Sequence, residues 1–214
     1  MDGNGRWASD QKKSRKYGHE VGSQRVYEVF KICTKYDFDT ATFFALSSEN
    51  SQRPDEEVSY ISSLLGLSIQ KHLNDLIQNK IKFKVIGDIS TLPDNTIEIV
   101  NNAEDLTKNF DKYKINIAYN YGGQWDILNT INRLLQNNIS LSIDAINKNL
   151  STGLDIPDII VRTGGYKRLS NFMLWQAAYC ELYFTDILWP DIKEENIISA
   201  IDYFKSIERK FGKV

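Results

Sequence analysis

The sequence has little cysteine: Cys33 and Cys180 are the two in 214 residues, and they lie far apart. This excludes a disulfide framework and a cysteine-based metal site, and it fits the reducing cytosol. Long apolar runs are also missing, since no stretch approaches the roughly 18 residues of a membrane-spanning helix. The opening residues are polar, unlike a secretory signal peptide. We therefore expect a soluble, cytoplasmic protein.

An excess of either charge is missing as well, with 26 Lys+Arg against 28 Asp+Glu. This balance argues against a general nucleic-acid binder and leaves the recognition of phosphates to local clusters of cations. The chain contains no internal repeat, no low-complexity tract and no long linker. Its 214 residues are enough for one sizeable α/β domain and few for two, so we expect a single domain over residues 1–214.

Strand patterns alternate with helix patterns along the chain, which favours a mostly parallel central sheet flanked by helices. Strands are predicted at 40–46, 81–87, 114–121 and 181–185, with a further strand beginning at residue 158. Helices are predicted at 23–36, 54–79, 95–109, 125–135, 143–150, 171–179 and 194–210. The apolar stripe of the helix at 54–79 is ordinary core packing or the wall of an apolar tunnel, and the pattern does not separate the two.

The first eight residues carry the most suggestive local chemistry. Gly3 and Gly5 flank Asn4, so the backbone can take positive φ and direct consecutive N–H groups towards one anion. Asp2 supplies a hard oxygen ligand of the kind Mg²⁺ prefers, and Arg6 supplies a forked donor for phosphate. These residues predict a loop that holds a metal-bridged diphosphate, and the alternative is an ordinary glycine turn.

Arg15 and His19 follow within a basic segment. Because Arg15 and His19 are four residues apart, they share one face if the segment is helical. Both side chains could then point towards a phosphate in the preceding loop. The alternatives are a solvated run of cations and a histidine used for packing or capping.

Two further groups of polar residues follow predicted strands. Asn50 and Arg53 come after the strand at 40–46, at the carboxyl-terminal edge where parallel sheets bind ligands. Arg162, Arg168 and Ser170 come after the strand that begins at residue 158, where we expect Ser170 to cap a helix. Two guanidinium groups and a hydroxyl at a helix N-terminus predict a diphosphate clamp.

The motifs taken together resemble the cis-prenyltransferase family, in particular its bacterial undecaprenyl diphosphate synthases, which are also called isoprenyl transferases. The matching segments span nearly the whole chain in the family's order: 2–8 (DGNGRWA), 18–19, 47–50 (SSEN) with 53–54, 86–88, 120–123 with 125–126, 162–165 (RTGG), 168–172 (RLSNF), and 181–186 (ELYFTD) with 188–190. A single such match would be weak evidence, but eight in register are not plausible by chance.

The resemblance implies Mg²⁺-dependent condensation of isopentenyl diphosphate with an allylic diphosphate such as farnesyl diphosphate, each new double bond being cis. It implies that Asp2 and Asn50 act in catalysis and that Asp2 and Glu181 hold the metal. The substrate-binding residues that it implies are Gly3, Asn4, Gly5, Arg6, Trp7, Arg15, His19, Ser47, Ser48, Glu49, Arg53, Arg162, Arg168 and Ser170. The sequence has no Asp-Asp pair, which fits because the trans-prenyltransferases carry aspartate-rich motifs.

The resemblance further implies a homodimer at the inner membrane face, with undecaprenyl diphosphate, a lipid carrier for cell-wall synthesis, as the product. The alternative is a non-catalytic partner subunit of an active chain. Family members have an apolar strand before the DGNGR motif, so we expect the usual first strand to be missing from this sequence. Lys167 stands where the family has a histidine. Tyr113 and Tyr119 are hypothesised to form a tunnel floor that shortens the product.

Overall fold

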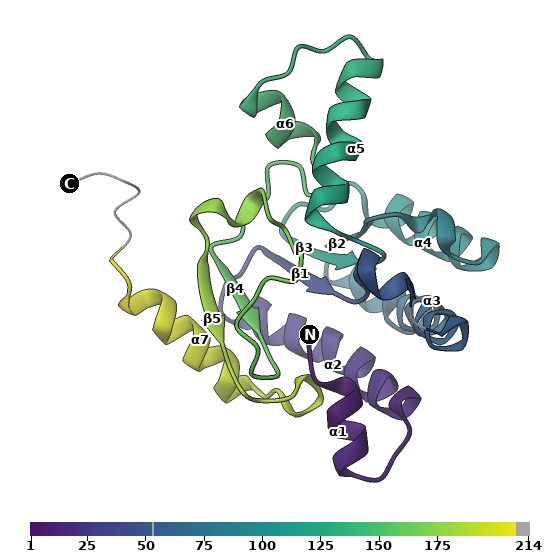
Figure 1. Ribbon diagram of the computed structural model, residues 1–214, viewed down its shortest axis with the longest axis vertical. Helices are drawn as coiled ribbons and strands as arrows, with labels where there is room; N and C mark the ends of the chain where they lie inside the picture. Colours follow the sequence, from purple (N-terminus) through teal and green to yellow (C-terminus); the bar gives the residue numbers. More distant parts are fainter. Residues whose placement is uncertain (53, 209–214) are drawn as a thin grey trace.

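The computed structural model describes residues 1–52 and 54–208, without the side chains of residues 51 and 52 (Figure 1). The strands form two parallel sheets, one in the order β1-β3-β2 and the other pairing β4 with β5. The strands are β1 (Thr40–Phe44), β2 (Ile81–Ile86), β3 (Tyr113–Ala118), β4 (Ile159–Arg162) and β5 (Glu181–Phe184). The expected α/β fold with parallel strands is therefore confirmed.

Helices cover the sheets and connect their strands. They are α1 (Asn4–Asp10), α2 (Arg15–Lys35), α3 (Asp55–Gln78), α4 (Asp94–Thr107), α5 (Gly123–Gln136), α6 (Ile143–Asn149) and α7 (Glu194–Ser206). Helix α2 packs on α1, α3 and β1, while α3 and α4 pack on β2 (Figure 1). Helices α5 and α6 pack on each other at one end of the molecule. None of the helices in the described ranges is long and apolar enough to cross a membrane.

The two faces of the three-stranded sheet differ because side chains alternate along a strand. On one face, Phe83, Ile115 and Ile117 belong to the main core that the sheet shares with α2 and α3. On the other face, Ile86 and Ala118 pack in a smaller cluster with Tyr121 and Met173. The first face therefore borders the space between the sheet and two long helices, and the second fixes the segment around residue 173.

The predicted loop at the start of the chain is instead the short helix α1. Gly3 takes a φ of +109°, a left-handed value that favours glycine, and its carbonyl accepts a hydrogen bond from the Trp7 amide at 2.9 Å. The left-handed turn that we assigned to a phosphate loop thus starts a helix directly after Asp2.

The predicted helix at 171–179 is wrong, and Ser170 is not its cap. Ser170, Asn171 and Met173 all have positive φ, which no right-handed helix accommodates, and only the 3₁₀ turn η3 (Gln176–Tyr179) follows. Long-range contacts fix this conformation: the Asn171 carbonyl accepts from the Gly123 amide at 2.6 Å, and its side-chain oxygen accepts from the Gln124 amide at 3.0 Å.

The start of α3 matches its prediction and the end of α7 does not. Helix α3 begins at Asp55, directly after Pro54. The three acidic residues in its first turn interact favourably with the positive end of the helix dipole. Helix α7 ends at Ser206 instead of the predicted residue 210. Residues 209–214 lie outside the described part of the chain.

Candidate active site

The backbone of Asp2 is fixed beside the carboxyl end of β4. The Thr163 hydroxyl, which is buried, accepts from the Asp2 amide and donates to the Asp2 carbonyl, each at 2.9 Å. The same carbonyl accepts from the Trp189 amide at 3.0 Å. Three hydrogen bonds from two distant segments therefore hold the position of Asp2.

The Asp2 carboxylate lies between two arginines. Nη2 of Arg162 donates to Asp2 Oδ2 at 2.9 Å, and Nη2 of Arg6 lies 3.5 Å from Oδ1. Arg6 also donates to the Gly164 carbonyl at 2.7 Å. Burial acts to raise the pKa of Asp2, but the hydrogen bond and charge of Arg162, with the charge of Arg6, outweigh it and bring the pKa below its ordinary value. Asp2 is therefore ionised at neutral pH.

Arg162 also connects this carboxylate to the segment after β4. Its Nη1 donates to Ser170 Oγ at 2.7 Å and to the Arg168 carbonyl. The Tyr166 ring lies between two guanidinium groups, 4.3 Å from that of Arg168 and 5.0 Å from that of Arg6, in cation–π geometry. The structure thus brings together the predicted clamp and the predicted metal ligand, because Arg162 contacts Asp2, Ser170 and the Arg168 carbonyl.

Arg15 and His19 meet on a carboxylate that sequence reasoning missed. Arg15 Nη2 and His19 Nε2 lie 3.2 Å and 3.0 Å from Glu57 Oε1, in the first turn of α3. Arg15 also lies against α1, because a Cβ added at Gly5 would come within 2.9 Å of its Nη1. The predicted shared helical face is present in α2, and it faces both Glu57 and the start of α1.

Residues 47–50 form a tight turn after β1. Oγ of Ser47 accepts from the Asn50 side-chain amide at 2.7 Å and from its backbone amide at 3.2 Å. Glu49 accepts from Asn171 Nδ2 at 2.6 Å, which joins this turn to the segment of Arg168 and Ser170. Burial acts to raise the pKa of Glu49, but the Asn171 hydrogen bond and those of the turn lower it overall. Ser48 begins the 3₁₀ turn η1 (Ser48–Gln52), and Arg53 lies outside the described residues.

Trp7 and Asn4 serve different parts of the site. The Trp7 indole donates to Asp191 at 2.7 Å and stacks on Tyr17, with ring centroids 5.9 Å apart, so it anchors α1 instead of facing the arginines. Asn4 Oδ1 is buried, and no described residue donates to it. Buried polar atoms are rarely left unpaired, so Asn4 Oδ1 and the similarly orphaned Arg162 Nε indicate a site that is completed by a ligand.

Glu181 begins β5, at the opposite end of the strand pair from Arg162. It pairs with Ile159, three register positions before Arg162 along the parallel strands, which is about 10 Å from the level of Asp2. The described residues include no group of three or more His, Cys, Asp or Glu that could hold a metal ion. Mg²⁺ commonly binds one or two carboxylates and takes its other ligands from substrate phosphates and water. A site with Asp2 as the protein ligand fits that mode.

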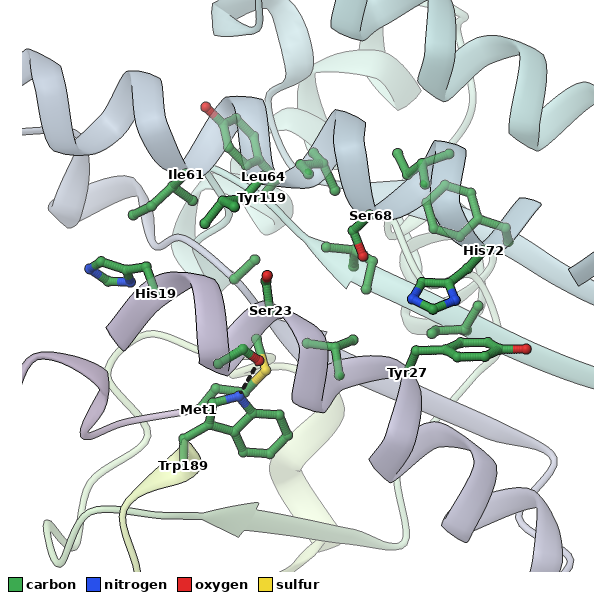
Figure 2. Close-up of a pocket in the computed structure, with 18 of the residues that line it drawn as sticks. Met1, His19, Ser23, Tyr27, Ile61, Leu64, Ser68, His72, Tyr119 and Trp189 are labelled. Carbon is green, nitrogen blue, oxygen red and sulfur yellow. Dashed lines mark hydrogen bonds between the residues drawn. The ribbon is translucent and has the colours of Figure 1, made fainter. Parts of the chain in front are cut away.

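An apolar cavity leads away from this cluster between α2, α3 and the sheet (Figure 2). Asn4 and His19 line it at the end near Asp2, and further in it is lined mainly by aliphatic and aromatic side chains from both helices and β3. Of the two interpretations left open for the apolar stripe of α3, the cavity favours the wall of an apolar space, and its polar end carries two of the predicted substrate-binding residues.

Sequence reasoning gave no individual role to three residues that contact the predicted site residues: Glu57, Thr163 and Tyr166. Thr163 could have been found from its place between Arg162 and two glycines, where a hydroxyl can bond a neighbouring backbone. In the sequence, Glu57 has the pattern of an acidic residue in the first turn of a helix, and Tyr166 has that of an exposed loop residue. Their contacts join segments that are far apart in the chain.

This fold and site define a class of α/β protein in which a cationic cluster adjoins an apolar cavity, suited to ligands with a diphosphate head and a hydrocarbon tail. A family model described as putative undecaprenyl diphosphate synthase matches residues 1–212. The chain belongs to this family of prenyl-transferring enzymes, the cis-prenyltransferases.

Individual relatives are similar over nearly the whole chain. The farnesyl-diphosphate-specific undecaprenyl diphosphate synthase of Yersinia pseudotuberculosis is 39% identical over 220 residues, covering 99% of this chain and 87% of that protein. The isoprenyl transferase of Neisseria gonorrhoeae is 40% identical over 215 residues, covering 100% of this chain and 87% of that protein.

Solved structures are similar as well. Lavandulyl diphosphate synthase from Lavandula x intermedia, crystallised with dimethylallyl diphosphate, has a TM-score of 0.93 and 28% identity, covering 100% of this chain and 95% of that one. A probable undecaprenyl diphosphate synthase from Campylobacter jejuni has a TM-score of 0.83 and 31% identity, covering 90% of this chain and 92% of that one.

Proposed function

We propose that this chain catalyses Mg²⁺-dependent condensation of isopentenyl diphosphate with an allylic diphosphate of the farnesyl class. The observation that carries the proposal is the position of Asp2, which is held between Arg6 and Arg162 near the polar end of the apolar cavity. A prenyl diphosphate needs cations for its head and an apolar space for its tail, and both adjoin the same carboxylate.

The two substrates would use different parts of the cluster. The allylic diphosphate would bind beside Arg6, Arg15 and the backbone of Gly3 to Gly5, with its tail in the cavity that begins at Asn4 and His19. Isopentenyl diphosphate would bind Arg162, Arg168 and Ser170, which are already joined by hydrogen bonds. Ionised Asp2 lies between these two regions.

The reaction breaks the allylic C–O bond, and inorganic diphosphate leaves with its electron pair. The alkene of isopentenyl diphosphate forms the new C–C bond through its terminal carbon, and loss of a proton from C2 of the isopentenyl unit to the diphosphate or to water forms the new double bond. Mg²⁺, when held by Asp2 and phosphate oxygens, would neutralise charge on the leaving diphosphate. Arg6 and Arg15 would stabilise the same developing charge, and Arg162 would keep Asp2 ionised. The turn of Ser47 to Asn50 would orient the substrates through the Asn50 amide, with Glu49 fixing the turn to Asn171.

The names of the relatives make undecaprenyl diphosphate, a lipid carrier in cell-wall synthesis, the product to seek first. Because such a product is a lipid, we place the reaction at the cytoplasmic face of the inner membrane.

We also propose that the chain forms a homodimer. Large apolar side chains are exposed on α5, on α6 and between them, among them Leu128, Leu135 and Ile143, which are 56–71% exposed. Exposed apolar residues gathered on neighbouring elements favour a protein interface, and a second copy of this chain is the partner that we propose. Sedimentation should give twice the monomer mass, and Leu128→Glu with Leu135→Glu should give monomers.

The reaction is tested with purified protein, farnesyl diphosphate, Mg²⁺ and labelled isopentenyl diphosphate. The proposal predicts label in an extractable polyprenyl product, abolished by EDTA and restored by added Mg²⁺. Absence of labelled lipid from folded protein would contradict it, and label that persists with EDTA would contradict the metal dependence.

A further inference from the structure

The turn after β4 places an aromatic ring beside the arginines of the candidate site. Gly164 and Gly165 have φ values of +85° and +81°, left-handed values that favour glycine. Their amides donate to the carbonyls of Ile187 and Thr185 at 2.8 Å and 2.9 Å, respectively. Tyr166 directly follows these two anchored residues, so the backbone that carries its ring is fixed in place.

The Tyr166 ring contacts one arginine from each of the two proposed diphosphate regions. Its centroid lies 5.0 Å from the guanidinium carbon of Arg6 and 4.3 Å from that of Arg168. Both distances lie within the range of about 6 Å over which a cation is attracted to an aromatic face. No described residue forms a hydrogen bond with the Tyr166 hydroxyl, so the ring itself makes the contact with both substrate regions.

The guanidinium of Arg168 is oriented by this ring and not by an acidic residue. Within residues 1–52 and 54–208, no carboxylate forms an ion pair with Arg168, and its guanidinium carbon lies over the Tyr166 ring. A cation–π contact uses the aromatic face and no N–H donor. The ring therefore orients Arg168 while its N–H groups remain available to a phosphate, whereas a carboxylate would occupy some of them.

Arg6 is held against the same turn on its other side. It donates to the Gly164 carbonyl at 2.7 Å and lies 3.5 Å from the Asp2 carboxylate. A Cβ added at Gly164 would come within 2.6 Å of Arg6 Nη2, so the missing side chain lets the arginine approach the turn. A diphosphate that binds Arg6 therefore acts on a side chain that contacts the turn and the Tyr166 ring together.

We propose that Tyr166 is a positioning residue that couples the two diphosphate sites. The inference rests on the proposed condensation and adds the residue through which binding of one substrate favours binding of the other. The ring is 45% exposed, so packing restrains it only in part. A diphosphate on Arg6 orders that arginine and the ring, and Arg168 then loses less conformational freedom when isopentenyl diphosphate binds. The coupling acts equally in both directions because binding free energies are reciprocal.

The test compares Tyr166→Leu, which removes the ring, with Tyr166→Phe, which keeps it. The dissociation constant of farnesyl S-thiolodiphosphate, a non-reactive analogue, is measured by calorimetry with Mg²⁺, without and with saturating isopentenyl diphosphate. The ratio of these two constants is the coupling factor. We expect Tyr166→Leu to lower this factor about two- to fivefold, the range of one exposed cation–π contact, and Tyr166→Phe to keep the wild-type factor.

Tyr113→Leu is the matched control. Lys112 Nζ lies 4.9 Å from the Tyr113 ring centroid, so this variant also removes a cation–π contact, from a tyrosine that does not line the apolar cavity. Its coupling factor should equal that of the wild type. Steady-state kinetics give a second measure: Tyr166→Leu should raise KM for isopentenyl diphosphate about two- to fivefold, while kcat stays within about twofold.

The outcomes separate this inference from the proposed function. Equal coupling factors in the wild type and Tyr166→Leu would overturn the inference, as would a Tyr166→Phe protein that behaves like Tyr166→Leu. A wild type that binds neither diphosphate in the presence of Mg²⁺ would overturn the proposed function. Both variants should unfold at the wild-type temperature, because the bonds that fix the turn come from the backbone of Gly164 and Gly165.

Discussion

Arg162 donates from Nη2 to the Asp2 carboxylate at 2.9 Å and from Nη1 to Ser170 Oγ at 2.7 Å. One guanidinium therefore joins the residue proposed to hold the metal and a residue proposed to hold the second substrate. Its planar fork serves both directions, which the point charge of a lysine would not.

Arg162→Gln should raise the pKa of Asp2 towards its ordinary value of 3.8, because the main hydrogen bond and charge that lower it are removed. The pKa is measured by NMR titration of the labelled Asp2 carboxyl carbon. We expect kcat/KM at neutral pH to fall on the order of 100-fold through loss of the phosphate contact. A variant with an unchanged Asp2 pKa would show that Arg162 does not control that carboxylate.

The same pair gives the fold a defined pH dependence. The pKa of Asp2 is lower in the folded protein than in the unfolded chain, so ionised Asp2 stabilises the fold. This contribution is present above the ordinary pKa of 3.8 and is lost as the pH falls through the pKa of the folded state. Urea unfolding from pH 5 to pH 2 should therefore show a steeper loss of stability in the wild type than in Arg162→Gln. Parallel curves would contradict this linkage.

Thr163→Val should destabilise the protein by about 1–3 kcal/mol, because it leaves the Asp2 amide without its hydroxyl partner in a buried position. Valine keeps the shape, so the loss reports the hydrogen bonds. The control is Thr34→Val, whose hydroxyl bonds the Lys31 carbonyl at the solvent-exposed surface, and it should change the free energy of urea unfolding by less than about 0.5 kcal/mol. Equal effects of the two variants would count against the anchoring role of Thr163.

Glu57→Gln should tighten binding of the allylic diphosphate roughly fivefold, because a negative charge beside Arg15 and His19 opposes an incoming diphosphate by about 1 kcal/mol. The farnesyl S-thiolodiphosphate dissociation constant measures this. Glu56→Gln is the matched control, since Glu56 is largely exposed and pairs with Lys16. Weaker binding to Glu57→Gln would mean that Glu57 positions the two cations instead of competing for them.

His72 should make the protein less stable in mild acid. Burial is the main cause that lowers its pKa below 6.5; Lys71 and Lys31 act in the same direction, and Asp75 opposes them. Because the unfolded chain takes up the proton more readily, stability should fall as the pH drops below 6.5. His72→Phe, which keeps a ring against Tyr27, should flatten the dependence of urea unfolding between pH 7 and pH 5; an unchanged slope would refute this assignment.

The sequence analysis predicted the parallel α/β fold because strand patterns and glycine turns are local features, and it placed Asp2 and Arg162 in one site only through the family resemblance. It failed where distant segments decide the conformation. Asn171 follows a good helix cap in sequence, yet its bonds to residues 123 and 124 hold it at positive φ. Trp7 lies in a motif with site residues, yet its indole binds Asp191. The stacked rings of Tyr27 and His72 join α2 and α3 through a contact that periodicity cannot reveal.

The central claim is that Asp2 carries the metal-dependent chemistry between two diphosphate sites. The most direct measurement is the single-turnover rate of the first condensation in wild type and Asp2→Asn across a Mg²⁺ titration. We predict that the wild-type rate saturates with Mg²⁺, and that Asp2→Asn, with comparable thermal stability, is at least on the order of 100-fold slower at saturation. A folded Asp2→Asn protein with the wild-type rate and Mg²⁺ dependence would contradict the claim.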